Sequence, residues 1–208
     1  MKTIKILSLI AFFISAVSCS SDDDNTPILE VESNLVENLH APQEGGQGQP
    51  ISGDFTKFNF ATGQTTVSET DWDIAFRGTI ILVNGGEITG IVDEPTRTGN
   101  AGAYIATGTM ATVSSVDTSL LIQDSETSPA ILTGSGAGWY SYAGPPTHLI
   151  TPIVGKILVF KTHDGKYAKL EILSYYKDAP VDPDAFTDLD QYYTFNYVYQ
   201  PNEDTLSF

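Results

Sequence analysis

The sequence has very little cysteine and little positive charge. Cys19 is the single cysteine, so the chain cannot form a disulfide within itself, and it lacks the paired cysteines of a structural zinc site. Lysine and arginine number 10 against 26 aspartates and glutamates, which gives a formal net charge of −16. A surface this acidic repels phosphate backbones, so the composition predicts that nucleic acid is not a partner.

Motifs of common enzyme classes are also missing. The sequence contains no G-x-S-x-G elbow, no glycine-rich phosphate loop and no H-E-x-x-H zinc motif. No serine lies at a spacing from His148 or His163 that selects a catalytic triad. The aspartates in "VDPDAFTDLDQ" (residues 181–191) have the oxygen ligands that calcium prefers, but Pro183 interrupts them and the EF-hand glycine is missing. We therefore expect a protein that is not an enzyme; a secreted hydrolase is the least supported alternative.

The only long apolar run lies at the N-terminus. Two lysines precede apolar residues up to Val17, a layout typical of a secretory signal peptide and too short for a stable membrane span. Residues 16–19, Ala-Val-Ser-Cys, resemble the lipobox of bacterial lipoproteins, in which the cysteine becomes the first mature residue and carries lipid. This resemblance implies a signal peptide over residues 1–18 and lipid attachment at Cys19. The alternative is a secreted protein with a free thiol.

Serines and aspartates follow Cys19 directly. Residues 20–24, Ser-Ser-Asp-Asp-Asp, resemble the acidic export tag of Bacteroidetes surface lipoproteins, which implies a lipid anchor in the outer membrane and exposure on the cell surface. A solvated acidic linker is the alternative. The stretch "PQEGGQGQP" (residues 42–50) cannot bury enough apolar area to order itself. We expect residues 19–50 to form a flexible acidic tether, with one early strand in "ILEVESNLVEN" (residues 28–38).

The remaining sequence has the patterns of short β-strands joined by tight turns. Residues 61–64 separate two short strand patterns, and both Asn84-Gly85-Gly86 and Asp164-Gly165 supply the residues that tight hairpins need. The segment "QYYTFNYVYQP" (residues 191–201) is rich in aromatic and β-branched residues. In "DWDIAF" (residues 71–76), a period of two places Trp72, Ile74 and Phe76 on one face and Asp71, Asp73 and Ala75 on the other. We expect a core strand with an acid at its outer face.

These patterns predict an all-β fold. No window predicts an amphipathic helix of more than two or three turns, and residues 113–121 come nearest to one. Removing residues 1–18 from the 208-residue chain leaves 190 residues, enough for one core. We predict one domain over residues 51–208, made of antiparallel strands and hairpins in two packed or strongly bent sheets.

Three segments carry a resemblance to a known family. They are "FNFATG" at residues 58–63, "DWDIAF" at 71–76 and "VFKTHDGKYAKLEI" at 159–172. In this order, over about residues 52–200, the sequence resembles the HmuY-like haem-binding lipoproteins of Bacteroidetes. The resemblance implies that haem lies between loops at one end of a β-rich fold, with its iron held by two histidines or methionines. It also implies a role in iron acquisition, in which haem passes to a TonB-dependent outer-membrane receptor.

Few residues of the mature chain qualify as ligands of haem iron. His40 lies in the expected tether and His163 in a tight turn, so neither is well placed to face a pocket. His148 follows a glycine- and proline-rich loop with several aromatics, a position that fits a pocket mouth. Met110 is the only methionine left after processing. We expect His148 and Met110 as axial ligand candidates; the alternatives are an ordinary loop histidine and a packing methionine.

Candidate pocket walls come from the same glycine-rich segments. We expect an apolar lining for the porphyrin and one cation, Arg97, for its propionates; the lining candidates are Tyr104, Trp139, Tyr140 and Tyr142. Because the sequence departs from the two-histidine pattern, another planar tetrapyrrole stays open as the ligand. The competing function is a cell-surface β module without haem, which recognises a glycan or a host protein.

Overall fold

The structure is a computed structural model, and it describes residues 27–46 and 48–208. All of the regular elements in these residues are β-strands, thirteen in number, so the predicted all-β fold is confirmed. Within this range, no helix is long and apolar enough to cross a membrane. The expected signal peptide, the lipid-bearing Cys19 and the export tag lie outside the described residues.

Five antiparallel strands form the larger sheet, in the order β1-β13-β12-β11-β8. They are β1 (Glu32–His40), β8 (Gly102–Thr107), β11 (Lys156–Lys161), β12 (Tyr167–Tyr176) and β13 (Asp190–Gln200). The hairpin expected at Asp164-Gly165 is confirmed as the β11–β12 connection, where Leu158 pairs with Leu170. The early strand expected in residues 28–38 is present as β1. It pairs with β13, so the sheet includes residues from the segment expected to be a tether.

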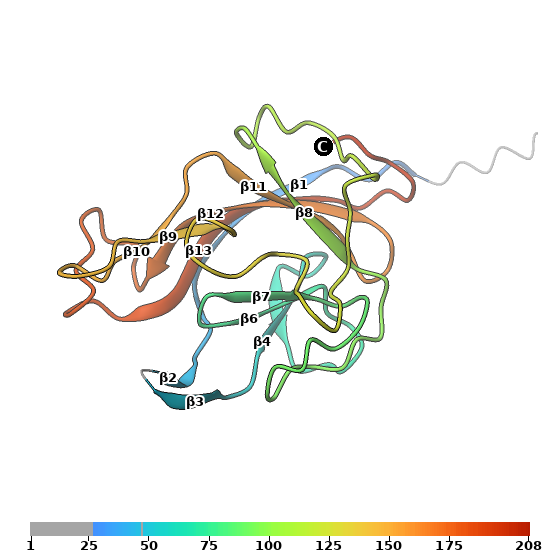
Figure 1. Cartoon of the computed structure of the whole chain (residues 1–208). Coiled ribbons are helices and arrows are strands. Elements are labelled where there is room, and N and C mark those ends of the chain that lie inside the picture. Colours follow the sequence, from blue (N-terminus) through green and yellow to red (C-terminus); the bar gives the residue numbers. More distant parts are fainter. Residues whose placement is uncertain (1–26, 47) are drawn as a thin grey trace, which may run out of the picture.

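Four strands form the smaller sheet, in the order β5-β4-β6-β7. They are β4 (Thr56–Asn59), β5 (Gln64–Thr66), β6 (Ile74–Arg77) and β7 (Ile80–Val83). The turn expected at residues 61–64 is confirmed between β4 and β5. Two short hairpins complete the fold: β2 (Glu44–Gly46) with β3 (Gln49–Ser52), and β9 (Tyr140–Tyr142) with β10 (Ile150–Pro152). Figure 1 shows the two sheets as layers and the β9–β10 hairpin projecting at one end.

The core between the two sheets is largely aromatic. Phe58 of β4 meets Phe195 and Tyr197 of β13 edge-on, with ring centroids 5.5 and 5.8 Å apart. Phe76 of β6 lies 4.8 Å from Tyr193, also of β13. Such pairs add to the stabilisation from burial itself. The alternate aromatic side chains of β13, Tyr193, Phe195 and Tyr197, therefore pack the larger sheet against the smaller one.

Two expectations for the smaller sheet are wrong. Trp72 does not share a face with Ile74 and Phe76, because β6 begins only at Ile74; Trp72 packs with Ala75 on the opposite face. Asp73 is not on an outer surface, since its side chain is 2% exposed. The period of two applies only within the strand, so it does not extend to residues that precede it.

The prediction of a tight hairpin at Asn84-Gly85-Gly86 is also wrong. After β7 the chain leaves the sheet, because the buried Asn84 side chain binds the backbone of two loops. Its Nδ2 donates to the carbonyls of Thr70 (3.0 Å) and Trp72 (2.8 Å), and its Oδ1 accepts from the backbone N–H of Thr98 (2.8 Å). Asparagine suits both a hairpin turn and this capping role, so the local sequence alone does not separate them.

Candidate functional site

The β9–β10 hairpin presents His148 at its tip. Tyr142 of β9 pairs with Ile150 of β10, and the backbone N–H of Ala143 donates to the Leu149 carbonyl (2.9 Å). The N–H of His148 donates to the Gly144 carbonyl (2.8 Å), and His148 itself has a positive φ of 55°. These bonds turn the chain sharply, so the exposed imidazole lies beside the strands that precede and follow it.

A hydrogen bond joins the His148 ring to a neighbouring tyrosine. The hydroxyl of Tyr142 and Nδ1 of His148 are the two partners. When the proton is on Nδ1, the ring donates to the tyrosine oxygen, and the lone pair of Nε2 is available to a metal. Ligating histidines in metalloproteins are oriented by such a bond at their second nitrogen.

The β12–β13 connection, residues 177–189, lies against this hairpin. The Phe186 ring meets the His148 ring edge-on, with centroids 5.9 Å apart. The connection is closed by a bond from Lys177 N–H to the Leu189 carbonyl (2.8 Å). Within it, Asp184 N–H donates to the Asp188 carboxylate (2.8 Å), and Phe186 N–H donates to the Asp184 carboxylate (2.9 Å). The sequence therefore forms an ordered loop that places Phe186 on His148.

The base of the hairpin is anchored in the core. Trp139 is 1% exposed, and its Nε1 donates to the Thr79 carbonyl (3.0 Å) in the β6–β7 turn. Its ring lies 5.2 Å from Tyr193 and 5.0 Å from Tyr140. The hydroxyl of Tyr176 accepts the N–H of Ile150 (3.1 Å). Burial raises the pKa of Tyr193 well above its usual value, so this phenol stays neutral.

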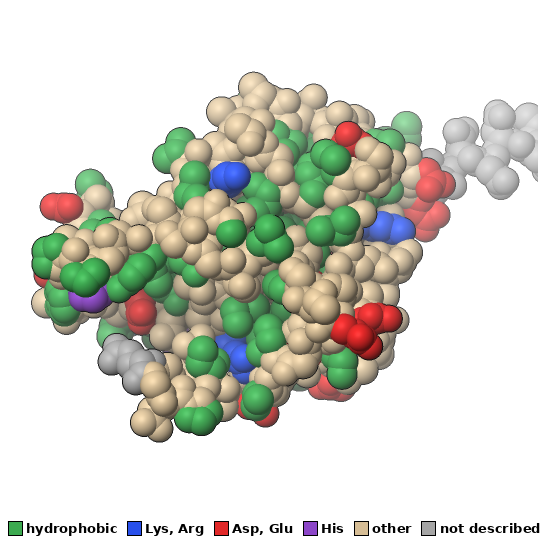
Figure 2. Space-filling view, in the orientation of Figure 1, with side chains coloured by type: hydrophobic (Ala, Val, Ile, Leu, Met, Phe, Trp, Pro, Cys, Tyr) green, Lys and Arg blue, Asp and Glu red, His purple; other side chains and the backbone are tan. Residues whose placement is uncertain are grey.

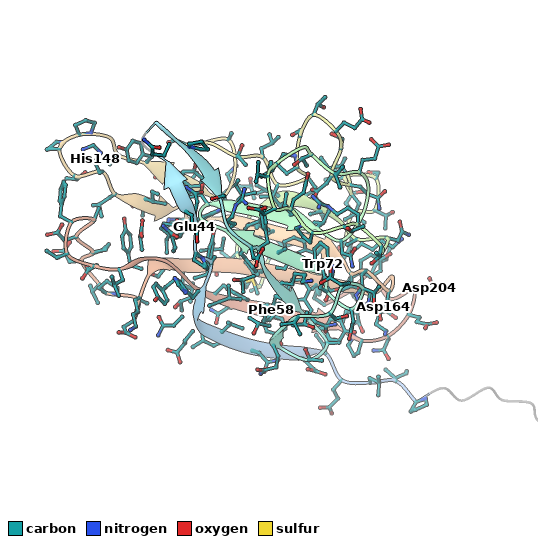
Figure 3. The ribbon with its side chains drawn as sticks, turned by 90° about the horizontal axis from the view of Figure 1, so that it is seen from below. Glu44, Phe58, Trp72, His148, Asp164 and Asp204 are labelled. Carbon is teal, nitrogen blue, oxygen red and sulfur yellow. The ribbon has the colours of Figure 1, made fainter. Side chains whose placement is uncertain are left out.

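Of the expected pocket residues, the structure brings four to this end of the molecule. Trp139 and Tyr140 form the base, while Tyr142 and His148 are exposed at the tip. Figure 2 shows hydrophobic side chains gathered around a histidine at this end, and Figure 3 shows His148 projecting away from the sheets.

Met110 and Tyr104 lie elsewhere. Both belong to a cluster with Ile157 and Val159 on the outer face of the larger sheet, whereas Tyr140 and Leu149 of the hairpin segment pack against the core on its inner face. The Met110 carbonyl accepts a bond from Lys169 Nζ (2.6 Å), also on the outer face. The structure therefore does not bring Met110 beside His148, because Met110 packs in the outer cluster whereas His148 is exposed at the tip of the projecting hairpin.

Arg97 is engaged in a buried ion-pair network. Its Nη2 donates to Glu94 (2.8 Å) and to Asp124 (2.9 Å), and its side chain is 2% exposed. Its Nη1 donates to the Pro95 carbonyl. These contacts connect the 89–97 loop to the 124–130 segment. Since the guanidinium is enclosed by its own partners, it is not positioned to pair with haem propionates.

The two other histidines of the described chain, His40 and His163, lie away from the β9–β10 hairpin. His40 follows the core residue Leu39, so by strand alternation its ring lies on the other face of the larger sheet, where it stacks on Tyr192 at 4.3 Å. His163 lies in the β11–β12 turn, next to Asp164, which Figure 3 shows at the opposite end from His148. Its Nδ1 bonds to Asp73 (2.7 Å).

The bond between His163 and Asp73 gives the fold a predicted pH dependence. The hydrogen bond to Asp73 raises the pKa of His163 above its usual 6.5, and nearby carboxylates add to this against the opposing effect of burial. A raised folded-state pKa stabilises the protein fully below 6.5, and the contribution is lost as the pH rises through the raised value. We expect the free energy of unfolding, measured in urea, to fall with rising pH across this window. His163→Gln should abolish the fall, and an unchanged slope in this variant would contradict the account.

A surface groove of about 590 Å³ has no histidine in its lining. It runs between β4–β5 and residues 93–96, with Phe55 and several carboxylates in its lining. None of the expected haem-binding residues lines it. We therefore place the candidate site at the β9–β10 hairpin, where the expected ligand has a free ring nitrogen.

Phe186 is the residue of this site that the sequence analysis did not identify. It was visible only as one apolar residue within the acidic segment 181–191. Single apolar residues are common on protein surfaces, so the sequence carries no signal that distinguishes Phe186.

Comparisons with known proteins find one family model and several solved structures that match this chain. The family model described as HmuY protein matches residues 52–197. The apo HmuY analogue of Tannerella forsythia is 16% identical with a TM-score of 0.50, and the match covers 84% of this chain and 99% of that one. A candidate lipoprotein from Bacteroides fragilis NCTC 9343 is 13% identical with a TM-score of 0.49, covering 84% and 94%. A candidate HmuY-like haem-binding protein from Bacteroides vulgatus ATCC 8482 is 14% identical with a TM-score of 0.40, covering 83% and 93%.

No curated protein matches the chain. The similarity to the Tannerella forsythia protein shows a shared fold, at an identity too low to carry over individual residues. The family model, in contrast, matches well over half of the sequence. The resemblance expected from residues 58–63, 71–76 and 159–172 is thereby confirmed, and the chain belongs to the HmuY family.

Proposed function

We propose that this protein binds haem, or a closely related tetrapyrrole, between the β9–β10 hairpin and the β12–β13 connection. We further propose that it is a lipoprotein anchored through Cys19 on the cell surface, that it passes its ligand to a TonB-dependent outer-membrane receptor, and that it has no catalytic activity. The observation that carries the haem proposal is the His148 imidazole, which is exposed, oriented at Nδ1 by Tyr142 and contacted by Phe186.

His148 has the chemistry of an axial ligand. Haem iron accepts an imidazole nitrogen, and the Nε2 atom of His148 is the one left free by the Tyr142 bond. The bond also limits rotation of the ring, so less freedom is lost when a metal binds. Of the histidines and methionines in the described chain, His148 is the one at this hairpin, so the proposal uses a single protein ligand.

The surroundings of His148 suit a planar apolar ligand. Phe186 and Tyr142 supply aromatic surface next to the imidazole, with ring centroids each 5.9 Å from it. Phe186 is 71% exposed and Tyr142 is 44% exposed, so both have area left to bury against a porphyrin. Trp139 and Tyr140 beneath them are anchored to the core. Haem would thus cover side chains that water now surrounds.

A visible absorption titration of haem into residues 25–208 tests this proposal. We expect a Soret band that saturates at one haem per protein, in both oxidation states of the iron or in one of them. The intrinsic fluorescence should also fall on binding, because Trp139 lies beneath the site. Absorbance that rises linearly with added haem, without saturation, would overturn the proposal.

The Tyr142 hydroxyl should affect affinity through His148. In Tyr142→Phe the His148 ring loses its hydrogen-bond partner at Nδ1, while the aromatic ring at position 142 is retained. We therefore expect haem affinity to fall about tenfold, as is usual when a group that orients a metal ligand is removed. Tyr192→Phe is the matched control, since that tyrosine contacts His40 on the other face of the larger sheet. Equal affinities in wild type and Tyr142→Phe would show that the bond does not orient the ligand.

A further inference from the structure

The β12–β13 connection exposes apolar side chains beside the proposed haem site. Val181 is 104% exposed, Phe186 71% and Leu189 59%. Soluble proteins seldom leave several large apolar side chains uncovered within so short a segment, and such patches mark interaction surfaces. The patch begins where the haem site ends, because Phe186 belongs to both.

This segment presents its side chains from an ordered backbone. The N–H groups of Thr187 (3.2 Å) and Asp188 (2.9 Å) donate to the Asp184 carbonyl, which forms one tight turn. The Lys177–Leu189 bond closes the base of the connection. An ordered surface loses little freedom on binding a partner, which favours its use as a docking site.

Carboxylates are interspersed with the apolar side chains along this segment. Asp182 and Asp184 are exposed, Asp188 is partly exposed, and residues 178–190 contain no lysine or arginine. The nearest cation along the chain, Lys177, lies 5.8 Å from the Tyr192 ring, and Tyr192 is on the face of the larger sheet away from the core. The patch therefore has a negative rim that is not neutralised within the connection.

From this arrangement we infer that residues 181–189 form the docking surface for a protein with an apolar centre and a basic rim. The inference rests on the proposed function, since such a partner would give or take the tetrapyrrole at the adjacent His148. The apolar centre would meet Val181, Leu189 and the part of Phe186 that haem leaves uncovered, while lysines or arginines would face Asp182, Asp184 and Asp188. Opposite charges accelerate encounter and set orientation. An anionic lipid surface is disfavoured because it would meet the same carboxylates.

Binding of a defined basic protein tests the inference. The probe is cytochrome c, whose lysine-rich face surrounds a covalently bound haem that cannot be transferred. Isotope-labelled residues 25–208 are titrated with the probe, and amide shifts are mapped. We expect the largest shifts in residues 178–190 and 142–149, a loss of binding at high salt, and no binding of lysine-acetylated cytochrome c.

Two triple variants separate this surface from the general acidity of the chain. Asp182→Asn, Asp184→Asn and Asp188→Asn together keep the acceptor oxygens of the loop, and should weaken probe binding about tenfold. The control combines Glu126→Gln, Glu203→Gln and Asp204→Asn at exposed positions elsewhere, and should change it less than twofold. Equal effects of the two triples, or shifts spread over the whole surface, would overturn the inference.

Haem titration of the same proteins distinguishes this inference from the proposed function. If haem binds and the probe maps elsewhere, the docking surface is overturned and the proposed function stands. If the probe maps to residues 178–190 but haem does not bind, the docking surface is supported and the proposed function is overturned.

Discussion

Replacing Asp73 with alanine is expected to lower the free energy of unfolding by about 2–5 kcal/mol, because two backbone N–H groups lose their acceptor, at about 1–3 kcal/mol each. Its carboxylate accepts three hydrogen bonds: from Phe60 N–H (2.7 Å), from His163 N–H (2.9 Å) and from His163 Nδ1 (2.7 Å). These bonds join the end of β4 and the segment before β6 to the β11–β12 turn, and therefore connect the two sheets. Alanine would leave the backbone donors buried without partners.

Urea denaturation followed by fluorescence measures this loss. Asp71→Ala is the matched control, because that carboxylate is two residues away and 64% exposed. We expect a much smaller effect there, since exposed charges contribute little to stability. Similar losses in the two variants would contradict the assignment of Asp73 as the connection between the sheets.

The second large effect is expected on ligand binding. His148→Ala should weaken haem binding on the order of 100-fold, which corresponds to about 2.7 kcal/mol, because it removes the only histidine at the β9–β10 hairpin. The variant should fold normally, since His148 is exposed and makes no core contact. Absorption titrations of wild type and variant give the two dissociation constants.

Two control variants test whether haem iron is instead bound by His40 or by Met110. His40→Ala removes a histidine on the other face of the larger sheet and should leave haem affinity unchanged. Met110→Leu keeps the packing of the outer cluster but removes the thioether, and should also bind normally. If Met110→Leu loses the haem spectrum while His148→Ala keeps it, the iron is bound at the outer face and the site is misplaced.

The parts of the fold that could be predicted are those with short-range signals. The β11–β12 hairpin follows from alternating residues on both sides of Asp164-Gly165, and the turn after β4 follows from residues 61–64. Both depend on residues that are neighbours in the chain. Two of the three segments that carry the family resemblance, residues 58–63 and 159–172, include these turns, and the family model matches residues 52–197.

Features that depend on distant contacts could not be predicted. Arg97 has the appearance of an exposed loop cation, but Asp124, 27 residues away, encloses it in an ion pair. Asn84 has the appearance of a hairpin residue, but it caps two loops that the sequence does not place beside it. In each case a buried polar partner outweighs the local preference.

The candidate site was predictable only in part. The loop that carries His148 was identified from its glycines, prolines and aromatics, whereas Phe186 reaches His148 because the β12–β13 connection folds against the hairpin. Met110 does not join His148, because it packs in the cluster on the outer face of the larger sheet, and sequence does not show which face of a sheet a loop covers. The ligand set therefore required the three-dimensional arrangement.

The central claim is that haem iron lies at His148, between the β9–β10 hairpin and the β12–β13 connection. Anomalous diffraction at the iron absorption edge, from crystals of the haem complex, tests it most directly. The account predicts a single strong iron peak within coordination distance of His148 Nε2, with Phe186 against the porphyrin. An iron peak beside Met110 on the outer face, or at His40 or His163, would contradict it.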